Sequence, residues 1–422
     1  MHRRRAAASE QDERASGDEN AAFIAIHWEA AGDLRAAFSW HLRAGTWFNY
    51  RDIRAARTSW QRAQQVADRM AVDEPDRSSM RISPRTLLCG SAFRVGVGPA
   101  HTGFDELREL ATTAHDDVSL AIGIAGQLTT LAFHSHYRQA VEMAAELEVL
   151  LDSIGDPTLI VALLYTAAQA QFEAGAASEC RRLVQRVIDL ADGDPMRGNV
   201  ILASPLAWAL SLRGAAGLSL GRPDWNTDVE QGIALAEPFD ATARVVPTLY
   251  RYAGAITNGA LLPDDGALQH TALLLKVAEQ SGDDVAVALA RLNRAVVLAR
   301  TNHGEGYRVL DMLGAARGAL AQTSGGLRRI ADVEFAREIA RQGDVHRALA
   351  LARNVLDEYD ALGDMIARGP ATALVVELLL RRGDRGDLEA AQAAVDRLAA
   401  VPTDPGFVLH EPHILRLSAL LA

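Results

Sequence analysis

Residues 155–194 read GDPTLIVALLYTAAQAQFEAGAASECRRLVQRVIDLADGD, two alanine-containing segments of helical period bounded by glycines. The three glycines, Gly155, Gly175 and Gly193, lie 20 and 18 residues apart. Glycine accepts the left-handed backbone that ends a helix, and an aspartate such as Asp156 caps the free amides that begin the next one. The segment therefore predicts two antiparallel helices joined by a short turn.

The same turn signal returns along the chain. Gly343, Gly363 and Gly386 lie 20 and 23 residues apart. Further Gly-Asp pairs are Gly193-Asp194, Gly282-Asp283, Gly343-Asp344, Gly363-Asp364 and Gly386-Asp387. A helix–turn–helix unit of roughly forty residues, stacked many times, explains this spacing. We predict an all-α fold, a tetratricopeptide (TPR)-like superhelical solenoid built as a right-handed array of antiparallel helix hairpins. The array spans residues 20–422, after a disordered polar tail over residues 1–19.

The residues before position 75 predict three helices. We expect them over 20–31, 34–48 and 52–70. The third carries Ala56, Trp60 and Ala63, the small–large–small spacing of the second helix of a TPR repeat, and Ala37, His41 and Ala44 repeat that spacing more weakly. Small residues let neighbouring helices approach, and the large one fills the space between them.

The succession of helices and turns is interrupted after residue 72 and becomes regular from about residue 118. Asp73 to Pro84 predicts a polar connector, residues 85–97 predict a helix, and Gly98 to Gly103 break the pattern. The later helices are expected over residues 118–133, 137–153, 157–173, 177–191 and 203–220, with a last helix that begins after Pro412 and reaches Ala422.

Composition excludes several classes of protein. The 422 residues are 49% hydrophobic, and the net charge of −11 argues against a nucleic-acid-binding surface. No run of eighteen apolar residues exists, so we expect no membrane span. Cys89 and Cys180 are the only cysteines, which implies no disulfide framework and fits a reducing cytoplasm.

Nucleotide and acyl-transfer motifs are incomplete. Lys276 is the only lysine and lies in an apolar helical pattern, so no Walker-type phosphate loop exists. The glycines of Gly98–Gly103 are followed by Phe104 and Asp105 in place of Lys and Ser/Thr. Gly217–Gly221 matches a nucleophile elbow, but a helical segment precedes it where that motif needs a strand. We interpret it as a helix end.

Other polar groupings also have structural interpretations. His134 with His136, and His410 with His413, lack the spacing of metal ligands on a helix, and His27 with His41 is expected to be packed among tryptophans. The aspartate pairs are interpreted as helix caps. They are Asp116-Asp117, Asp264-Asp265 and Asp283-Asp284. The turns with Arg328-Arg329 and Arg381-Arg382 are expected to be solvated.

The chain resembles the C-terminal helical-repeat region of a bacterial family of multidomain signalling proteins. The segments that carry the resemblance include Ala22–Asp33, Asn49–Ala56, Arg81–Thr86, Phe104–Leu110, Asp189–Pro195, Ala203–Pro205, Leu220–Trp225 and Ser281–Asp284. In that family a class III adenylate/guanylate cyclase domain is followed by an AAA-type or NB-ARC-like ATPase module and a TPR-like array. The cyclase aspartates and Walker motifs of relatives have no match here, so no catalytic residue and no cofactor is carried over.

These observations favour a non-catalytic scaffold or sensor that binds a protein partner, an upstream cyclase/ATPase module or a small effector. The alternatives are part of a nucleotide-binding enzyme, or a transcriptional regulator whose catalytic or DNA-binding domains lie elsewhere. Candidate contacts on the concave face are Trp208 with Arg213, and Arg85 with Arg94, each pair on one predicted helix. Ordinary packing and surface charge are the alternative interpretation of these four residues.

Overall fold

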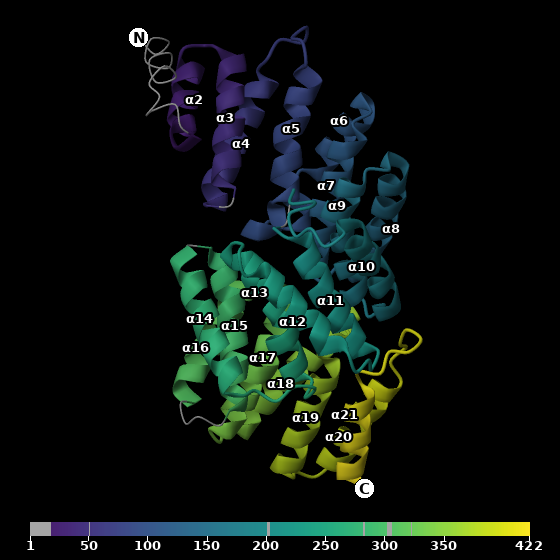
Figure 1. Cartoon of the computed structure of the whole chain (residues 1–422). Coiled ribbons are helices and arrows are strands. Elements are labelled where there is room, and N and C mark those ends of the chain that lie inside the picture. The colour runs from purple at the N-terminus through teal and green to yellow at the C-terminus, as the bar shows by residue number, and fades with distance from the viewer. Residues whose placement is uncertain (1–17, 50, 201–202, 282, 302–305, 322) are drawn as a thin grey trace. The chain divides into compact units, whose positions relative to one another are not determined.

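The computed structural model describes residues 18–49, 51–200, 203–281, 283–301, 306–321 and 323–422. Every regular element in these ranges is helical (Figure 1). The expected polar tail lies outside the described residues as far as residue 17, and Asp18 and Glu19 begin the short 3-10 helix η1 (Asp18–Asn20). Gly282 of the predicted Gly282-Asp283 turn also lies outside them. The all-α class is confirmed for the described part of the chain.

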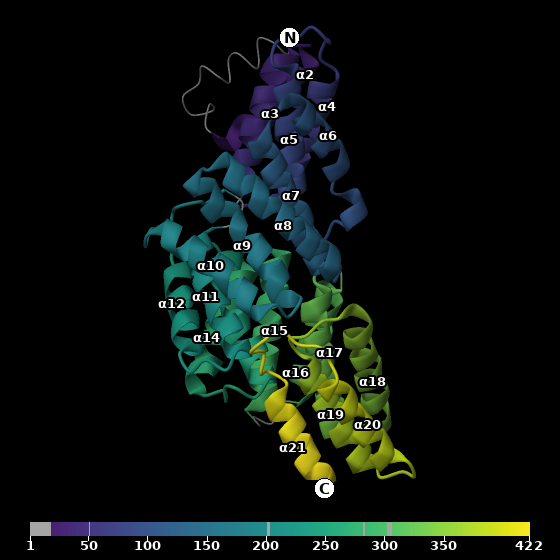
Figure 2. The ribbon, with the colours of Figure 1, turned by 90° about the vertical axis from the view of Figure 1, so that its right-hand side faces the viewer.

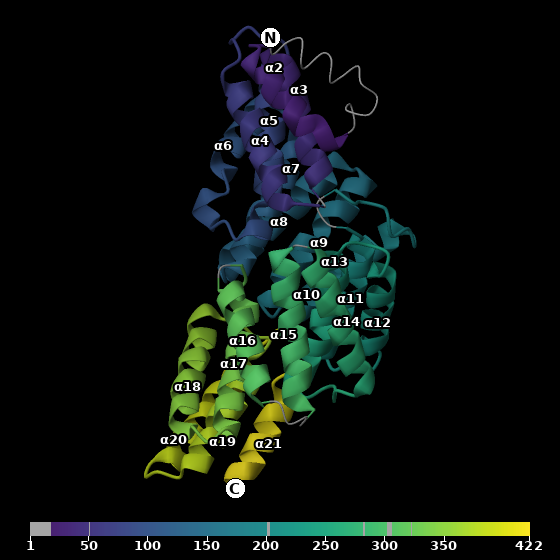
Figure 3. The same cartoon turned by 90° about the vertical axis from the view of Figure 1, so that its left-hand side faces the viewer.

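The contacts divide the chain into an N-terminal unit that ends at Thr130 and a C-terminal unit that begins at Leu131. In the N-terminal unit, α2 packs on α3, α3 on α4, α4 on α5 and α5 on α6. Figure 3 shows this succession of neighbouring helices. After η1, its elements are α2 (Ala21–Ala30), α3 (Leu34–Phe48), α4 (Ile53–Asp68), α5 (Arg77–Gly90), η2 (Ala92–Val95), η3 (Pro99–His101), α6 (Phe104–Ala114) and most of α7 (Asp117–Phe133).

The C-terminal unit continues the pattern, with each helix packed against the next along the chain. Figure 2 shows α17, α18, α19 and α20 in this arrangement. The elements are α8 (Tyr137–Ile154), α9 (Pro157–Glu173), α10 (Ala177–Ala191), α11 (Pro205–Ser219), α12 (Trp225–Ala236), α13 (Ala241–Leu249), the π-helical turn η4 (Tyr250–Ile256), α14 (Asp265–Ser281), α15 (Asp284–Arg300), α16 (Gly306–Leu320), α17 (Gly325–Arg341), α18 (Val345–Leu362), α19 (Arg368–Arg382), α20 (Asp387–Ala399) and α21 (Glu411–Leu421).

The predicted turn chemistry is present. Gly155 has a φ of 70°, and Asp156 accepts a hydrogen bond from the Thr158 amide at 2.8 Å. Asp344 likewise caps α18 through the Arg347 amide at 3.0 Å. Three Gly-Asp pairs differ from the prediction. The carboxylate of Asp364 binds Arg329 and that of Asp387 binds Arg382, and Asp194 precedes a turn rather than a helix, since α11 begins at Pro205.

The small–large–small spacing is confirmed as core packing. Ala56 and Ala63 are fully buried, and Trp60 is among the largest buried side chains. Gly45 of α3 lies against the Trp60 ring, where an added Cβ would come within 2.1 Å of the indole Nε1. A glycine here is therefore required by the close approach of α3 and α4.

The predicted connector over residues 73–84 is wrong in its second half. α5 begins at Arg77 and contains Pro84. Met80 packs with Val66 and Met70, and Ile82 is also buried. Burial of these apolar side chains outweighs the helix-breaking tendency of a proline that removes one backbone hydrogen bond. The helix expected over 85–97 is also interrupted, because α5 ends at Gly90 and only the single turn η2 follows.

Candidate functional site

A groove in the N-terminal unit separates α2 from α4, with α3 beneath it. Its volume is about 540 Å³. One wall is an apolar row on α2, the other is a polar row on α4, and His41 of α3 lies at the base. The lining residues are Ala22, Ile26, Glu29, Ala30, His41, Thr58, Ser59, Arg62 and Arg69. We call this the α2–α4 groove.

The apolar wall is unusually exposed for residues of its type. α2 reads AAFIAIHWEA, which is apolar almost all the way round. A helix of this kind is normally covered on more than one side. Ile24 and Ala25 are fully buried, but Phe23 and Ile26 are 57% and 59% exposed. In the described residues, α2 is thus covered on one side only, by α3 and η1.

A polar triad crosses the base of the groove. Glu29 accepts hydrogen bonds from Arg69 Nη1 at 2.7 Å and from His41 Nε2 at 3.3 Å. Burial opposes ionisation of Glu29, but these two hydrogen bonds outweigh it and lower the pKa of the carboxyl. Burial lowers the pKa of His41, which is 3% exposed, although Glu29 acts in the opposite direction. At neutral pH His41 is therefore a neutral donor to a carboxylate.

The polar wall contributes one unpaired cation. Arg62 is exposed and forms no ion pair within the described residues. The hydroxyl of Thr58 donates to Arg54 O, and that of Ser59 donates to Ala55 O, so both are satisfied within α4. The groove therefore offers an apolar row and a free guanidinium to an occupant.

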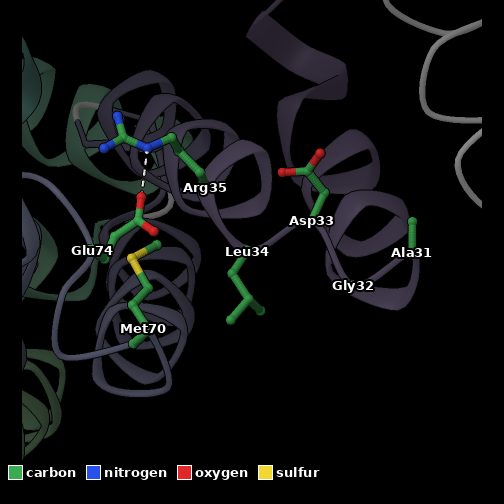
Figure 4. Close-up of a pocket in the computed structure, with 8 residues that line it drawn as sticks. Ala31, Gly32, Asp33, Leu34, Arg35, Met70 and Glu74 are labelled. Atoms are coloured by element: carbon green, nitrogen blue, oxygen red, sulfur yellow. Dashed lines mark hydrogen bonds and ion pairs between the residues drawn. The ribbon is translucent and has the colours of Figure 1, made fainter.

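A second hollow of about 480 Å³ lies at the turn between α2 and α3 (Figure 4). Leu34 and Met70 supply its apolar lining. Arg35 turns toward Glu74 there, with 3.0 Å between Nε and Oε1, and also binds Asp76. Asp33 caps α3 through the Ala36 amide. Because the charges of this hollow already have partners, it is a weaker candidate than the α2–α4 groove.

The C-terminal unit contains a buried polar cluster, made of Ser135, Tyr137, Arg329 and Asp364. Arg329 is 1% exposed, and its Nη2 lies 2.6 Å from Asp364 Oδ2, 2.8 Å from Tyr137 Oη and 3.1 Å from Ser135 Oγ. Tyr137 donates to the same Asp364 oxygen at 3.1 Å. The cluster connects the start of α8 and the turn before it, the second turn of α17, and the loop between α18 and α19.

Arg329 corrects one expectation from the sequence. The Arg328-Arg329 turn was expected to be solvated, but Arg329 is buried and Arg328 binds Asp332 and Glu358. Burial opposes the charge of Arg329, and the Asp364 carboxylate outweighs it and raises the pKa of the guanidinium. Arg329 therefore stays charged, and the cluster serves as a tie between distant segments.

Glu173 lies near this cluster at the end of α9. Its carboxyl accepts a hydrogen bond from Gln169 Nε2 at 3.1 Å, and the side chain is half-buried. Burial raises the pKa of Glu173 to about 8, with Asp364 acting in the same direction and Arg329 against it. Glu173 is thus protonated at neutral pH.

The four predicted concave-face residues lie in internal contacts. Arg85 is buried and binds Asp68 and Glu106, both at 2.8 Å. Arg94 lies in η2, on a different element from Arg85, and donates to Asn49 O at 2.9 Å.

The other predicted pair does share α11. Trp208 is buried and donates to Ala243 O at 3.3 Å. Arg213 binds Asp228, with 2.6 Å between Nη2 and Oδ1, and Gln185 at 2.9 Å. None of the contacts formed by these four residues requires an outside partner.

The elbow-like segment and the histidine groupings noted in the sequence have structural roles. Ser219, in the elbow-like segment, ends α11, and its buried hydroxyl donates to Ala215 O. His134 and His136 lie in the turn before α8, and His410 binds Met365 O. Among the described residues, no three His, Cys, Asp or Glu side chains gather as a metal ion would require. In the same part of the chain, no helix combines the length and apolar character needed to cross a bilayer.

Comparison with known proteins identifies no family. No family model matches the sequence, and no curated protein matches it. The resemblance to the repeat region of cyclase–ATPase signalling proteins therefore stays a prediction, and the site is interpreted from its own geometry.

Proposed function

We propose that the chain is a non-catalytic TPR-like scaffold of a cyclase/ATPase-type signalling protein, and that it binds a protein partner through the α2–α4 groove. The exposed Phe23 and Ile26 beside the groove carry this proposal. Covering an aliphatic or aromatic side chain contributes about 2 kcal/mol, so a partner that buries both gains a useful fraction of a binding free energy. Apolar patches of this kind mark interaction sites.

The groove favours binding over chemistry. Its carboxylate is engaged by two donors, its histidine is neutral, and the hydroxyls of Thr58 and Ser59 are bound to their own helix. A nucleophile with a neighbouring base, as acyl or phosphoryl transfer requires, is not among the lining residues. Partner binding would be relayed if the partner favours one of two curvatures of the array. The two free, buried cysteines fit a cytoplasmic location.

Selection from displayed peptide libraries tests the proposal. The purified chain is presented to random peptides, and the Ile26→Asp variant serves for counter-selection. We expect peptides that bind the wild type at least about tenfold more tightly than the variant. Recovery of no Ile26-dependent peptide would contradict the proposal.

A separate measurement addresses the enzymatic alternative. Isothermal titration with ATP and GTP is expected to show no micromolar binding. Micromolar affinity for either nucleotide would favour a retained cyclase or ATPase activity over the scaffold.

A further inference from the structure

We infer that the occupant of the α2–α4 groove is an amphipathic α-helix of a protein partner that carries an acidic side chain beside its apolar stripe. This inference rests on the proposed function and adds the conformation and the chemistry of the partner. Its three grounds are the spacing of the apolar wall, the scarcity of groups that match an extended backbone, and the unpaired cation.

The apolar wall has the spacing of a helix ridge. Ala22, Ile26 and Ala30 lie at i, i+4 and i+8 on α2, so they form one row along the helix. The small residues on either side of Ile26 leave depressions that accept knobs from a second helix, which is how ridges pack into grooves. α2 has 10 residues and is about 15 Å long, which matches about three turns of a partner helix.

An extended peptide would fit this groove poorly. Its backbone amides and carbonyls would lose water on entry and need new partners. The lining residues include neither Asn nor Gln, and the hydroxyls of Thr58 and Ser59, whose hydrogens bind within α4, can only accept. Few lining groups therefore match the alternating donors and acceptors of an extended backbone. A helix forms its backbone hydrogen bonds internally, so it needs only apolar contacts from the groove.

The sign of the partner's charge follows from Arg62. The charge of Glu29 is paired with Arg69, and its carboxylate also accepts from His41, whereas Arg62 has no ion-pair partner among the described residues. A Glu or Asp on the partner, one turn from its apolar stripe, would pair with the Arg62 guanidinium on the opposite wall. Residues 18–130 contain 12 arginines and 14 acidic residues, so their net charge of −2 is small beside the −11 of the whole chain and adds little long-range repulsion of an acidic helix.

Two displayed libraries of equal diversity test the inference on the full chain. One varies the surface of an alanine-rich helix, and the other varies extended sequences interrupted by proline. We expect the Ile26-dependent binders to come from the helical library and to carry Asp or Glu. If they come from the extended library, or show no preference for acidic residues, the inference is wrong while the proposed function stands. If neither library yields such binders, both fail.

A charge exchange then tests the role of Arg62. Arg62→Glu is expected to weaken the best acidic helical binder about tenfold, and replacing that binder's Glu by Lys is expected to restore affinity for the variant. Arg138→Glu, at an exposed position of α8, is the matched control and should leave affinity unchanged. Failure of the exchange to restore binding would overturn the inference. So would light scattering that shows a dimer lost in Ile26→Asp, because a second copy would then be the occupant.

Discussion

The N-terminal unit and the C-terminal unit are both built from helix–turn–helix elements, but they differ in the contacts between segments that are far apart in the sequence. In the N-terminal unit each helix packs on its neighbours along the chain, and one face of α2 is left without cover in the described residues. In the C-terminal unit, segments far apart in sequence also meet, as where Tyr137 binds Asp364 and where the Val408 amide donates to Ser219 O at 2.8 Å. An uncovered helix face can serve as a binding surface, whereas hydrogen bonds between distant segments make an array more rigid.

The largest expected effect on stability comes from breaking the buried ion pair between Arg329 and Asp364 in the C-terminal unit. Asp364→Ala leaves the buried guanidinium of Arg329 without its counter-ion, so we expect the free energy of unfolding to fall by about 3–5 kcal/mol. Urea denaturation followed by circular dichroism measures it. Asp152→Ala removes an exposed ion pair with Arg186 and should cost less than about 1 kcal/mol. Equal losses in the two variants would contradict a special role for the cluster.

Glu173 makes the same unit sensitive to pH. The pKa of its carboxyl is raised in the folded state, so the folded chain binds more protons than the unfolded chain between about pH 4.5 and pH 8. Stability should therefore fall as the pH rises through this window. We expect Glu173→Gln to remove that fall and to be about 2 kcal/mol more stable at high pH, allowing for screening at a half-buried side chain.

Urea midpoints from pH 5 to pH 9 check this prediction. Glu142→Gln, at an exposed position of α8, is the control and should keep the wild-type pH profile. A Glu173→Gln profile that falls as steeply as the wild type would refute the assignment.

Close packing in the N-terminal unit is tested at Gly45. Gly45→Ala places a methyl group against the Trp60 ring, so we expect a loss of about 1–3 kcal/mol from overpacking. The control Gly318→Ala lies in α16 with nothing within 4 Å of the new Cβ, and should stabilise the chain by up to about 1 kcal/mol. Thermal unfolding of both variants measures the difference, and a gain at Gly45 would show that α3 and α4 can separate.

The smallest effect on stability is expected at the uncovered face of α2. Ile26→Asp should change the free energy of unfolding by no more than about 0.5 kcal/mol, because that side chain is already exposed to water. Ile24→Asp, two residues earlier and fully buried, should unfold the N-terminal unit. Similar stabilities for the two variants would mean that α2 is not held by one face alone.

Local chemistry predicted the helices well. The bounds expected for residues 34–48, 137–153 and 157–173 agree with α3, α8 and α9 within one residue, because glycine and aspartate at the turns act within a few residues of themselves. The interpretation of Gly217–Gly221 as a helix end is confirmed for the same reason. The helix content of the Pro84 segment was missed, because tertiary burial of Met80 and Ile82 decided it.

The candidate sites were harder to predict. Asp364 has the same local context as Asp344, and only the arrival of Arg329 and Tyr137 from distant positions distinguishes it. The helical positions of Arg85 and Arg213 predict contacts on the concave face, but each guanidinium forms an ion pair with another helix of the chain. A signal for the α2–α4 groove did exist in AAFIAIHWEA, whose apolar residues surround the whole helix.

The tie between Tyr137 and Asp364 also constrains how this protein can change in length. An open stack of hairpins can gain or lose a pair of helices and keep every remaining interface. Here, one hairpin inserted or deleted between Tyr137 and Arg329 would displace Arg329 and Asp364 from Tyr137. One inserted or deleted between Arg329 and Asp364 would separate that ion pair. The polar cluster therefore constrains the number of hairpins between residues 137 and 364.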